Sequence, residues 1–299
     1  MRKGARIKEI VLVNVFFLIF VTMNSSIATE TSTIINNVHP KSLFGLQSII
    51  DVSWNGSQTS EPLVPNGNVR VITLDVSYWV VHGILGKIIL WYYLLTFESV
   101  TVTIEIVNKP DYCSADLSIS QLSFLIDDEI TVGHTHLVVA VNQYAPAFEP
   151  FNIQLKASVD SVFGPFGFLP FIDGDQRIFN LSLIAEYFPL IDVTPEYGYL
   201  ETTPGTTVID PITVENLGNG KTLVDTHIIN IPENWIAILS PSQLAIEVNE
   251  SEMTNLSITP PYDFYGYGVI TVSFTPKYYY NPVHQGTPMY LQILVEVKP

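Results

Sequence analysis

The sequence predicts an all-β protein made of two tandem immunoglobulin-like antiparallel β-sandwiches. Three observations predict it: short segments that alternate with period two, turn residues between them at short intervals, and one motif that occurs twice. Residues 106–122 and 228–244, aligned at a constant offset of 122, are identical at nine of seventeen positions. Unrelated segments of ordinary composition would match at only about one or two of these positions. The chain therefore contains a duplication.

The second half of the chain is a series of short strand-like segments. Apolar and polar residues alternate, as in Thr222–Ile228, and no helical period is sustained over three turns. Pro, Gly and Asn separate the segments. The predicted strands are 189–195, 205–218, 222–232, 235–240, 243–248, 252–260, 267–276 and 289–299. This pattern is typical of a seven- to eight-stranded antiparallel sandwich.

The first half repeats the second half upstream of the motif as well. The segment IIDVS at 49–53 matches LIDVT at 190–194, and ITLD at 72–75 matches ITVE at 212–215. The motif therefore lies at the same place in two consecutive domains. We expect these domains to span 44–185 and 186–299.

The residues of the repeated motif have structural roles that follow from their chemistry. Its Asn-x-Pro sequence ends a strand, because proline cannot donate a hydrogen bond to the next rung of a sheet. Pro110 and Pro232 occupy this position. Cys113 and Trp235 follow three residues later, and we expect both to be buried at the start of matching strands. Cys113 is the only cysteine, so the chain forms no intrachain disulfide.

The N-terminal residues 1–28 have the features of a secretory signal peptide. A basic segment, MRKGARIKE, precedes the 14-residue apolar run IVLVNVFFLIFVTM, and small residues lead to a cleavage site after Ala28. The run is short for a transmembrane helix, and an uncleaved membrane anchor is the alternative. We expect residues 29–43 to form a linker and the domains to lie outside the cell or on its surface.

The charge of the chain argues against nucleic acid as a partner. The formal net charge is −16, and residues 1–28 hold four Lys or Arg and one Glu, so the remainder carries −19. A surface this negative repels phosphate backbones. Four Asn-x-Ser/Thr sequons follow the signal peptide and are candidate glycosylation sites in an exported chain: Asn55, Asn180, Asn249 and Asn255.

No group of residues forms a recognisable catalytic or metal-binding motif. His134 and His136 share one strand face, as two zinc ligands can, but the sequence offers no third ligand. The acidic segments Asp173–Asp175 and Asp127–Glu129 lack the register of a calcium loop. Cys113 has no nearby His and Met for a copper site. We therefore predict no enzyme activity, no catalytic residues, no cofactor and no metal.

The chain also resembles a known family at the residues VENLGN (214–219), IPENWIAILSPSQL (231–244) and ITPPYDFYGYGVITVSF (258–274). They resemble the immunoglobulin-like domain associated with alpha-galactosidases and novel carbohydrate-binding modules. The tandem arrangement is similar to that of uncharacterised prokaryotic surface proteins, mostly archaeal. This resemblance covers about residues 45–299 and implies a structural motif without chemistry.

These observations lead to two hypotheses about function. The first is a non-catalytic structural or adhesion module of a cell surface, which contacts other surface proteins or a second copy of itself. The second is a carbohydrate-binding accessory module, in which exposed aromatic rings stack on sugar faces. The tyrosines expected to do so are Tyr262, Tyr265, Tyr278, Tyr279 and Tyr280.

The two copies differ most at residues 78–97. Domain 1 carries twenty mostly apolar residues where domain 2 needs only Gly218 and Asn219. The uninterrupted apolar part is too short to span a bilayer. One interpretation is a helix or hairpin that seals an open end of the sandwich. The other is an exposed surface that docks a partner or enters a membrane interface, formed by Trp79, Ile84, Leu85, Trp91, Tyr92 and Leu95.

Overall fold

The computed structural model describes residues 45–299 except 68, 84–85, 97 and 164–169. The expected signal peptide and the whole of the expected linker, residues 1–43, lie outside the described residues. Almost all regular structure in the described part is β-strand, with two short helices, α2 (Ser57–Ser60) and α3 (Gly86–Thr96). Neither helix has the length and apolar character needed to cross a bilayer.

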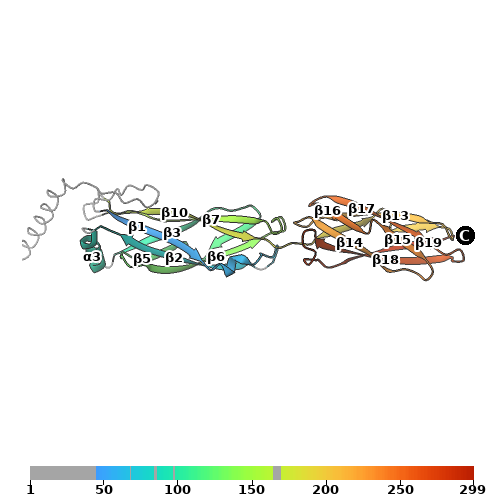
Figure 1. Ribbon diagram of the computed structural model, residues 1–299, viewed down its shortest axis with the longest axis horizontal. Coiled ribbons are helices and arrows are strands. Elements are labelled where there is room, and N and C mark those ends of the chain that lie inside the picture. The colour runs from blue at the N-terminus through green and yellow to red at the C-terminus, as the bar shows by residue number, and fades with distance from the viewer. Residues whose placement is uncertain (1–44, 68, 84–85, 97, 164–169) are drawn as a thin grey trace, which may run out of the picture. The chain divides into compact units, whose positions relative to one another are not determined.

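The first sandwich, which we call domain 1, consists of two facing sheets (Figure 1). Sheet I has the strand order β4-β6-β2-β1-β9-β8, and sheet II has the order β10-β7-β3-β5. The strands are β1 (Leu46–Trp54), β2 (Arg70–Val81), β3 (Ser99–Asn108), β4 (Cys113–Leu117), β5 (Gln121–Leu125), β6 (Thr131–Val141), β7 (Pro150–Val159), β8 (Val162–Phe163), β9 (Pro170–Asp173) and β10 (Asp175–Ile184).

The second sandwich, domain 2, is built in the same way. Sheet III has the order β11-β13-β17-β15, and sheet IV has the order β12-β19-β18-β14-β16. The strands are β11 (Ile191–Pro195), β12 (Tyr199–Thr202), β13 (Val208–Asn216), β14 (Thr222–Asn230), β15 (Ile236–Ser240), β16 (Gln243–Ile246), β17 (Ser251–Thr259), β18 (Gly266–Tyr278) and β19 (Met289–Val297).

The strand orders of the two domains are equivalent. The order β4-β6-β2-β1 in sheet I corresponds to β15-β17-β13-β11 in sheet III, and all of sheet II corresponds to β19-β18-β14-β16 in sheet IV. Two facing, mainly antiparallel sheets of this kind form an immunoglobulin-like sandwich. The predicted fold class, two tandem sandwiches of this type, is confirmed.

The two copies of the sequence repeat also share a break in strand register and the turn that follows it. A break in register occurs between Ile106 and Asn108 opposite β7, and between Ile228 and Asn230 opposite β18. The turn that follows is closed by equivalent hydrogen bonds. The amide of Cys113 donates to the carbonyl of Pro110 (3.0 Å), and the amide of Trp235 donates to that of Pro232 (3.2 Å). Each pair lies 122 residues apart, as in the sequence alignment.

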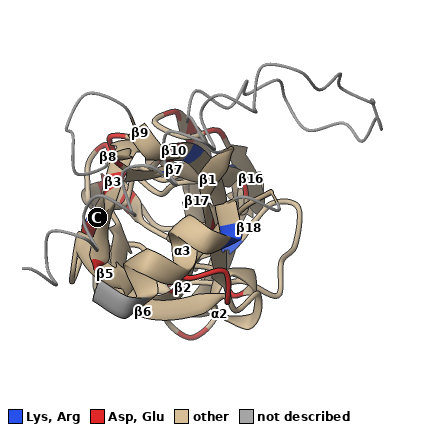
Figure 2. Ribbon diagram, turned by 90° about the vertical axis from the view of Figure 1, so that its left-hand side faces the viewer, with Lys and Arg blue, Asp and Glu red and all other residues tan. Residues whose placement is uncertain are grey.

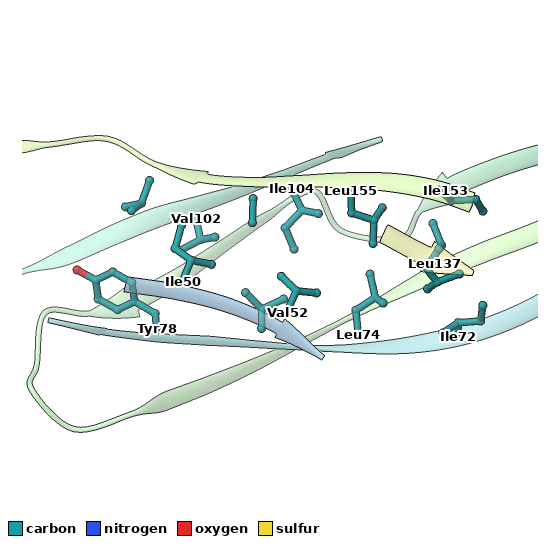
Figure 3. Packing of buried hydrophobic residues seen from close by; sticks show 14 of the residues in the cluster. Ile50, Val52, Ile72, Leu74, Tyr78, Val102, Ile104, Leu137, Ile153 and Leu155 are labelled. Carbon is teal, nitrogen blue, oxygen red and sulfur yellow. The ribbon is translucent and has the colours of Figure 1, made fainter. Parts of the chain in front are cut away.

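Each sandwich encloses its own hydrophobic core. Because side chains alternate across a strand, every second residue points between the sheets. Figure 3 shows this in domain 1, where Ile50 and Val52 of β1 face Val102 and Ile104 of β3. Domain 2 has a separate core that includes Trp235. Two cores of this size explain how the chain folds without a disulfide.

Two strand pairings depart from the expected antiparallel pattern. Strand β9 pairs with β1 in parallel, and β12 pairs with β19 in parallel. In domain 2 the chain leaves β11 in sheet III and crosses to sheet IV as β12, so the start of the domain joins both sheets. The eight strands predicted between 189 and 299 are all present, whereas β12 is an additional ninth strand.

The two domains are joined through buried contacts around Asn219. Its side-chain amide donates to the carbonyls of Ala145 (2.7 Å) and Glu186 (2.8 Å), and its side-chain oxygen accepts a hydrogen bond from the amide of Phe188 (2.6 Å). Its main-chain carbonyl accepts from the amide of Ala147 (3.1 Å). Asn219, in the turn between β13 and β14 of domain 2, therefore binds both a loop of domain 1 and the connecting segment.

Candidate functional site

The outer face of sheet IV carries a cluster of tyrosines and charged residues. Glu296 lies on β19 between Tyr267 of β18 and Glu201 of β12, which are its direct partners in the sheet register. The Tyr267 hydroxyl donates to a Glu296 oxygen (3.0 Å), and the Tyr199 hydroxyl donates to the other. Lys298 forms ion pairs with Glu201 (2.7 Å) and Glu296 (3.2 Å). We call these five residues the tyrosine–carboxylate cluster.

The cluster shifts the protonation equilibria of its members. The hydrogen bond to Glu296 raises the pKa of Tyr199 to about 12, and the same carboxylate raises the pKa of Tyr267. In return the hydrogen bonds from Tyr199 and Tyr267 and the ion pair with Lys298 hold the pKa of Glu296 below its ordinary value. Tyr199 and Tyr267 are therefore protonated, and Glu296 is ionised, near neutral pH.

Further exposed apolar residues lie on the outer face of sheet IV outside the cluster. Val269 of β18 lies opposite Leu294 of β19, and Tyr290 lies farther along β19. All three are exposed, as are Tyr199 and Tyr267. Hydroxyls tethered to a carboxylate orient the tyrosine rings while their surfaces stay accessible. Such rings suit the packing of a partner, since tyrosine combines a large contact area with a polar end.

No sequence motif predicts that these five residues form one cluster. Tyr199 and Glu296 lie almost a hundred residues apart and meet only because β12 pairs in parallel with β19. Strand β12 has four residues and follows the turn-forming sequence Pro-Glu-Tyr-Gly. The regular alternation in LQILVEV, which turns Glu296 outward, was the one available signal.

The tyrosines expected to stack on sugars do not form one site. Tyr262 and Tyr265 lie in the loop before β18, whereas Tyr278 ends that strand and Tyr279 and Tyr280 follow it. A strand of 13 residues separates the groups by roughly 40 Å at 3.3 Å per residue. Tyr262 and Tyr265 are exposed, and the Tyr262 ring lies directly over the backbone of Gly205.

Tyr278 belongs to the contacts between the two domains. Its ring centroid is 5.1 Å from that of Phe148 in domain 1 and 5.2 Å from that of Tyr187 in the connecting segment. Tyr279 lies under the ammonium of Lys221, 4.6 Å from the ring centroid, and Tyr280 is exposed. Tyr278 is thus placed to join domains, and Tyr279 and Tyr280 have the more accessible rings.

The apolar segment 78–97 is divided between a strand and a helix. Residues 78–81 continue β2, where Tyr78 is fully buried and Trp79 is half-buried. Helix α3 follows, with Leu90 and Tyr93 in the core and Trp91 and Tyr92 exposed. Ile84, Leu85 and the side chain of Leu95 lie outside what the structure describes. One face of this segment therefore covers the sandwich, and another face is open.

The repeated residues Cys113 and Trp235 are both buried. Cys113 is the first residue of β4, and Trp235 directly precedes β15. Burial raises the pKa of the Cys113 thiol, so the thiolate needed for reactivity is disfavoured. Trp235 packs edge-on against Phe264 with ring centroids 5.1 Å apart. These two residues have structural positions and offer no reactive group.

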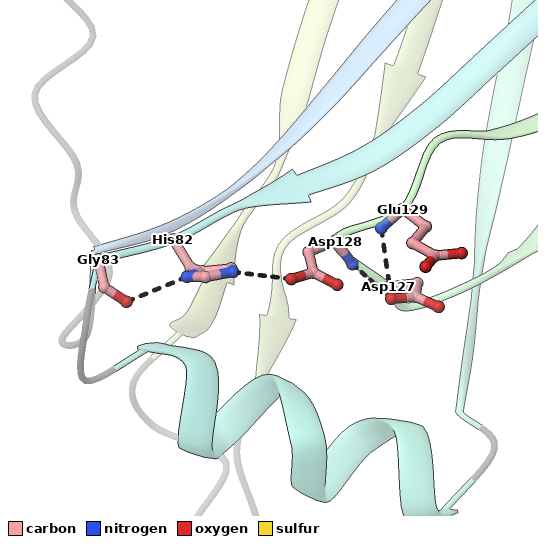
Figure 4. A network of polar contacts seen from close by, with 5 residues as sticks. All are labelled: His82, Gly83, Asp127, Asp128 and Glu129. Carbon is pink, nitrogen blue, oxygen red and sulfur yellow. Dashed lines mark hydrogen bonds and ion pairs between the residues drawn. The ribbon is translucent and has the colours of Figure 1, made fainter.

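His134, His136 and the acidic segment Asp127–Glu129 lie on the surface of domain 1, whereas Asp173 of the other acidic segment is buried. His134 Nδ1 is 2.8 Å from Asp75 Oδ1 on the neighbouring strand, and His136 contacts Thr73. Near α3, His82 contacts Asp128 (3.1 Å), whose neighbour Asp127 accepts amide hydrogen bonds from Asp128 and Glu129 (Figure 4). Within the described ranges, no three His, Cys, Asp or Glu side chains gather as metal ligands would.

A shallow groove of about 670 Å³ runs between β3 and β4 in domain 1. It is lined mainly by Ile104–Lys109 and Ala115–Leu117. Lys109 Nζ donates to the carbonyl of Cys113 (2.6 Å) across one end. The groove is open and holds no group of convergent reactive side chains.

The four sequons beyond the signal peptide all present their asparagines to solvent. Asn180 lies on β10, Asn255 lies on β17, and Asn55 and Asn249 lie in turns. A glycosylation enzyme requires this accessibility.

No protein-family model matches the chain, and no curated protein matches it significantly. Among solved structures, it is similar to the D00-D0 domain of intimin at 9% identity and a TM-score of 0.33, over 83% of this chain and 99% of that one. It is also similar to the E. coli chaperone DraB, at 7% identity and a TM-score of 0.26 over 82% of this chain and 98% of that one.

A shorter match is the PapD-like domain 7 of human CEP192, at 12% identity and a TM-score of 0.29, over 36% of this chain and 84% of that one. TM-scores this low carry no argument about function. The immunoglobulin-like assignment rests on the strand order described above. The narrower resemblance to the alpha-galactosidase-associated domain finds no support in these comparisons.

Proposed function

We propose that the chain is an exported, non-catalytic adhesion module of a cell surface, in which the outer face of sheet IV binds a partner protein. The observation that carries this proposal is the tyrosine–carboxylate cluster, in which Glu296 orients the rings of Tyr199 and Tyr267 on an open sheet face. The signal-peptide pattern of residues 1–28 supports export.

The composition of the face favours a protein partner. Protein interfaces are enriched in tyrosine at their centres and surround these residues with polar groups. Here Tyr267, Val269 and Leu294 form the apolar part, while Glu201 and Lys298 lie at its border. The buried junction around Asn219 supports a role in holding this face at a defined position relative to domain 1.

The test is binding of the purified chain to cell envelopes from the organism that produces it. The double variant Tyr199→Ala, Tyr267→Ala should weaken binding at least about tenfold, because hot-spot residues typically contribute this much or more. The control is Ile209→Ala, Met253→Ala on the exposed face of sheet III, which should bind like the unaltered chain. Unchanged binding by the first variant would remove the tyrosine–carboxylate cluster from the binding site.

The alternative is a carbohydrate-binding accessory module, and the exposure of Tyr262, Tyr265 and Tyr280 favours it. The same envelopes separate the two functions. Protease treatment should abolish binding if the partner is a protein, whereas periodate oxidation of glycans should abolish it if the partner is a carbohydrate. Retention on insoluble polysaccharide that is lost in Tyr262→Ala, Tyr265→Ala would establish the alternative.

A further inference from the structure

Helix α3 covers the end of domain 1 at which the chain enters the sandwich. A Cβ atom on Gly86 would lie 3.0 Å from the side chain of Leu46, the first residue of β1, so helix and entry point are in direct contact. Leu90 and Tyr93 anchor the helix in the core. Figure 2 shows the helix lying across this end of the domain.

The opposite side of the helix is exposed and apolar. Ile88 is 66% exposed, Trp91 63% and Tyr92 54%. Because these residues are three and four positions apart, they share one helix face. Lys87 is the only charged residue between Gly86 and Thr96. A helix that is apolar on all sides normally has a second apolar environment to contact.

The equivalent end of domain 2 is a contact surface. The turn between β13 and β14 corresponds to the connection that holds α3, because β13 and β14 correspond to β2 and β3. In domain 2 that turn contains Asn219, which bonds to Ala145, and Gly220, which lies against Ala147. In domain 2 this end of the sandwich is therefore in contact with domain 1.

We propose that the exposed face of α3, formed by Ile88, Trp91 and Tyr92, rests in the interfacial region of a lipid bilayer. Tryptophan and tyrosine favour this region, because each combines an apolar ring with a polar group. The exposed area of the three side chains is roughly 350 Å², at about 200 Å² for a large side chain. A stable dimer needs about 800 Å² from each copy, so this surface is too small for a second copy to be the favoured partner. A shallow lipid contact does not require a larger area than these three side chains provide.

The charges around α3 determine which lipid it contacts. Three acidic residues, Asp127, Asp128 and Glu129, lie beside the helix, together with the basic residues His82, which contacts Asp128, and Lys87, which lies on the helix itself (Figure 4). The chain beyond residue 28 carries −19. Anionic headgroups repel such a surface. Helix α3 should therefore bind zwitterionic membranes more strongly than anionic membranes. Most interfacial helices are basic and have the opposite lipid preference.

The experiment uses the chain from Pro40 onward, which forms one compact unit. It lacks the apolar run 10–23, so lipid binding must come from the folded domains. Co-sedimentation with phosphatidylcholine vesicles should be at least about tenfold weaker for Trp91→Ser, Tyr92→Ser. The control Ile236→Ser, Ile238→Ser removes two similarly exposed apolar residues from domain 2 and should leave binding unchanged. Urea midpoints close to that of the unaltered chain would verify that both variants fold.

A second measurement locates the contact. Among the four tryptophans, Trp91 is the exposed one, so brominated lipid should quench fluorescence in the unaltered chain and much less in Trp91→Phe. The proposal is overturned if the chain does not bind vesicles, if the control loses binding equally, or if vesicles with 30% or so phosphatidylserine bind better by electrostatic attraction. A dimer in sedimentation that Trp91→Ser, Tyr92→Ser dissolves would identify a second copy as the occupant instead. The Tyr199→Ala, Tyr267→Ala variant should keep full vesicle binding, so this proposal and the adhesion function fail independently.

Discussion

Trp235 is the largest side chain in the hydrophobic core of domain 2. It fills the space between the sheets, and a Cβ atom on Gly268 would lie 2.6 Å from its ring. Its indole nitrogen is buried and has no hydrogen-bond partner among the described residues. The value of this side chain therefore lies in its volume and not in its polar group.

We expect Trp235→Ala to lower the free energy of unfolding by about 3–5 kcal/mol, because it leaves a large cavity. Trp235→Phe keeps an aromatic ring and removes the unsatisfied N–H group, so it should cost much less. Urea unfolding of both variants measures the difference. A loss below about 1 kcal/mol for Trp235→Ala would mean that the side chain is not a core residue.

Glu296 controls the ionisation of its two tyrosine neighbours. Its negative charge and hydrogen bond stabilise the protonated phenol of Tyr199, whose pKa is about 12. In Glu296→Gln the charge is lost, so the pKa of Tyr199 should fall toward its ordinary value near 10. The absorbance of tyrosinate between pH 10 and 12 should then rise earlier than in the unaltered chain. Coincident titration curves would contradict the cluster geometry.

The sign of the pH dependence at acid pH follows from the same cluster. The folded-state pKa of Glu296 is lowered. Glu296 therefore stabilises the folded protein at pH values above the pKa that this residue has in the unfolded chain. The contribution is lost as the pH falls through the pKa that Glu296 has in the folded protein. Because the residue is on the surface, this contribution is small.

At the scale of single elements, α3 has two faces with different roles. Leu90 is almost completely buried in the core of domain 1, whereas Ile88 is exposed two residues earlier. We expect Leu90→Ala to reduce the free energy of unfolding by about 2–5 kcal/mol and Ile88→Ala to change it by less than about 0.5 kcal/mol. Thermal or urea unfolding provides the measurement. Similar losses in both variants would mean that the helix is packed on both sides.

Strands were easier to predict from the sequence than the contacts between them. The eight predicted strands of domain 2 are present because alternation and Pro/Gly boundaries are local signals. Strand β12 was not predicted, since four residues carry too little alternation and its parallel partner lies at the other end of the domain. The candidate site was missed for the same reason, because it needs Tyr199 from that strand.

The predicted insert 78–97 contains the end of β2, residues 78–81, and helix α3. Its first residues continue β2, and Tyr78 is fully buried within the sandwich. Apolar content alone does not separate a strand end from a helix start. The two interpretations, seal and contact surface, were not distinguishable in sequence, because a single helix can serve both with different faces.

At the scale of the whole molecule, Asn219 joins the domains. Asn219→Ala leaves two buried carbonyls and one amide without their partner. Each unsatisfied group costs about 1–3 kcal/mol of folding free energy, reduced where water replaces the lost hydrogen bond. We therefore expect a measurable loss of stability, with domain 2 unfolding at a lower urea concentration. Asn55→Ala, at an exposed turn, is the control. Equal urea midpoints for the two variants would mean that the junction does not couple the domains.

The proposed function places the binding surface of the chain on the outer face of sheet IV. The most direct measurement places a photo-cross-linking amino acid at Tyr267 or at Met253 in cells that produce the chain. These positions are 63% and 59% exposed and lie on different sheets of domain 2, so accessibility is matched. We expect a discrete protein adduct from position 267 and none from position 253. Adducts from both positions alike, or from position 253 alone, would contradict it.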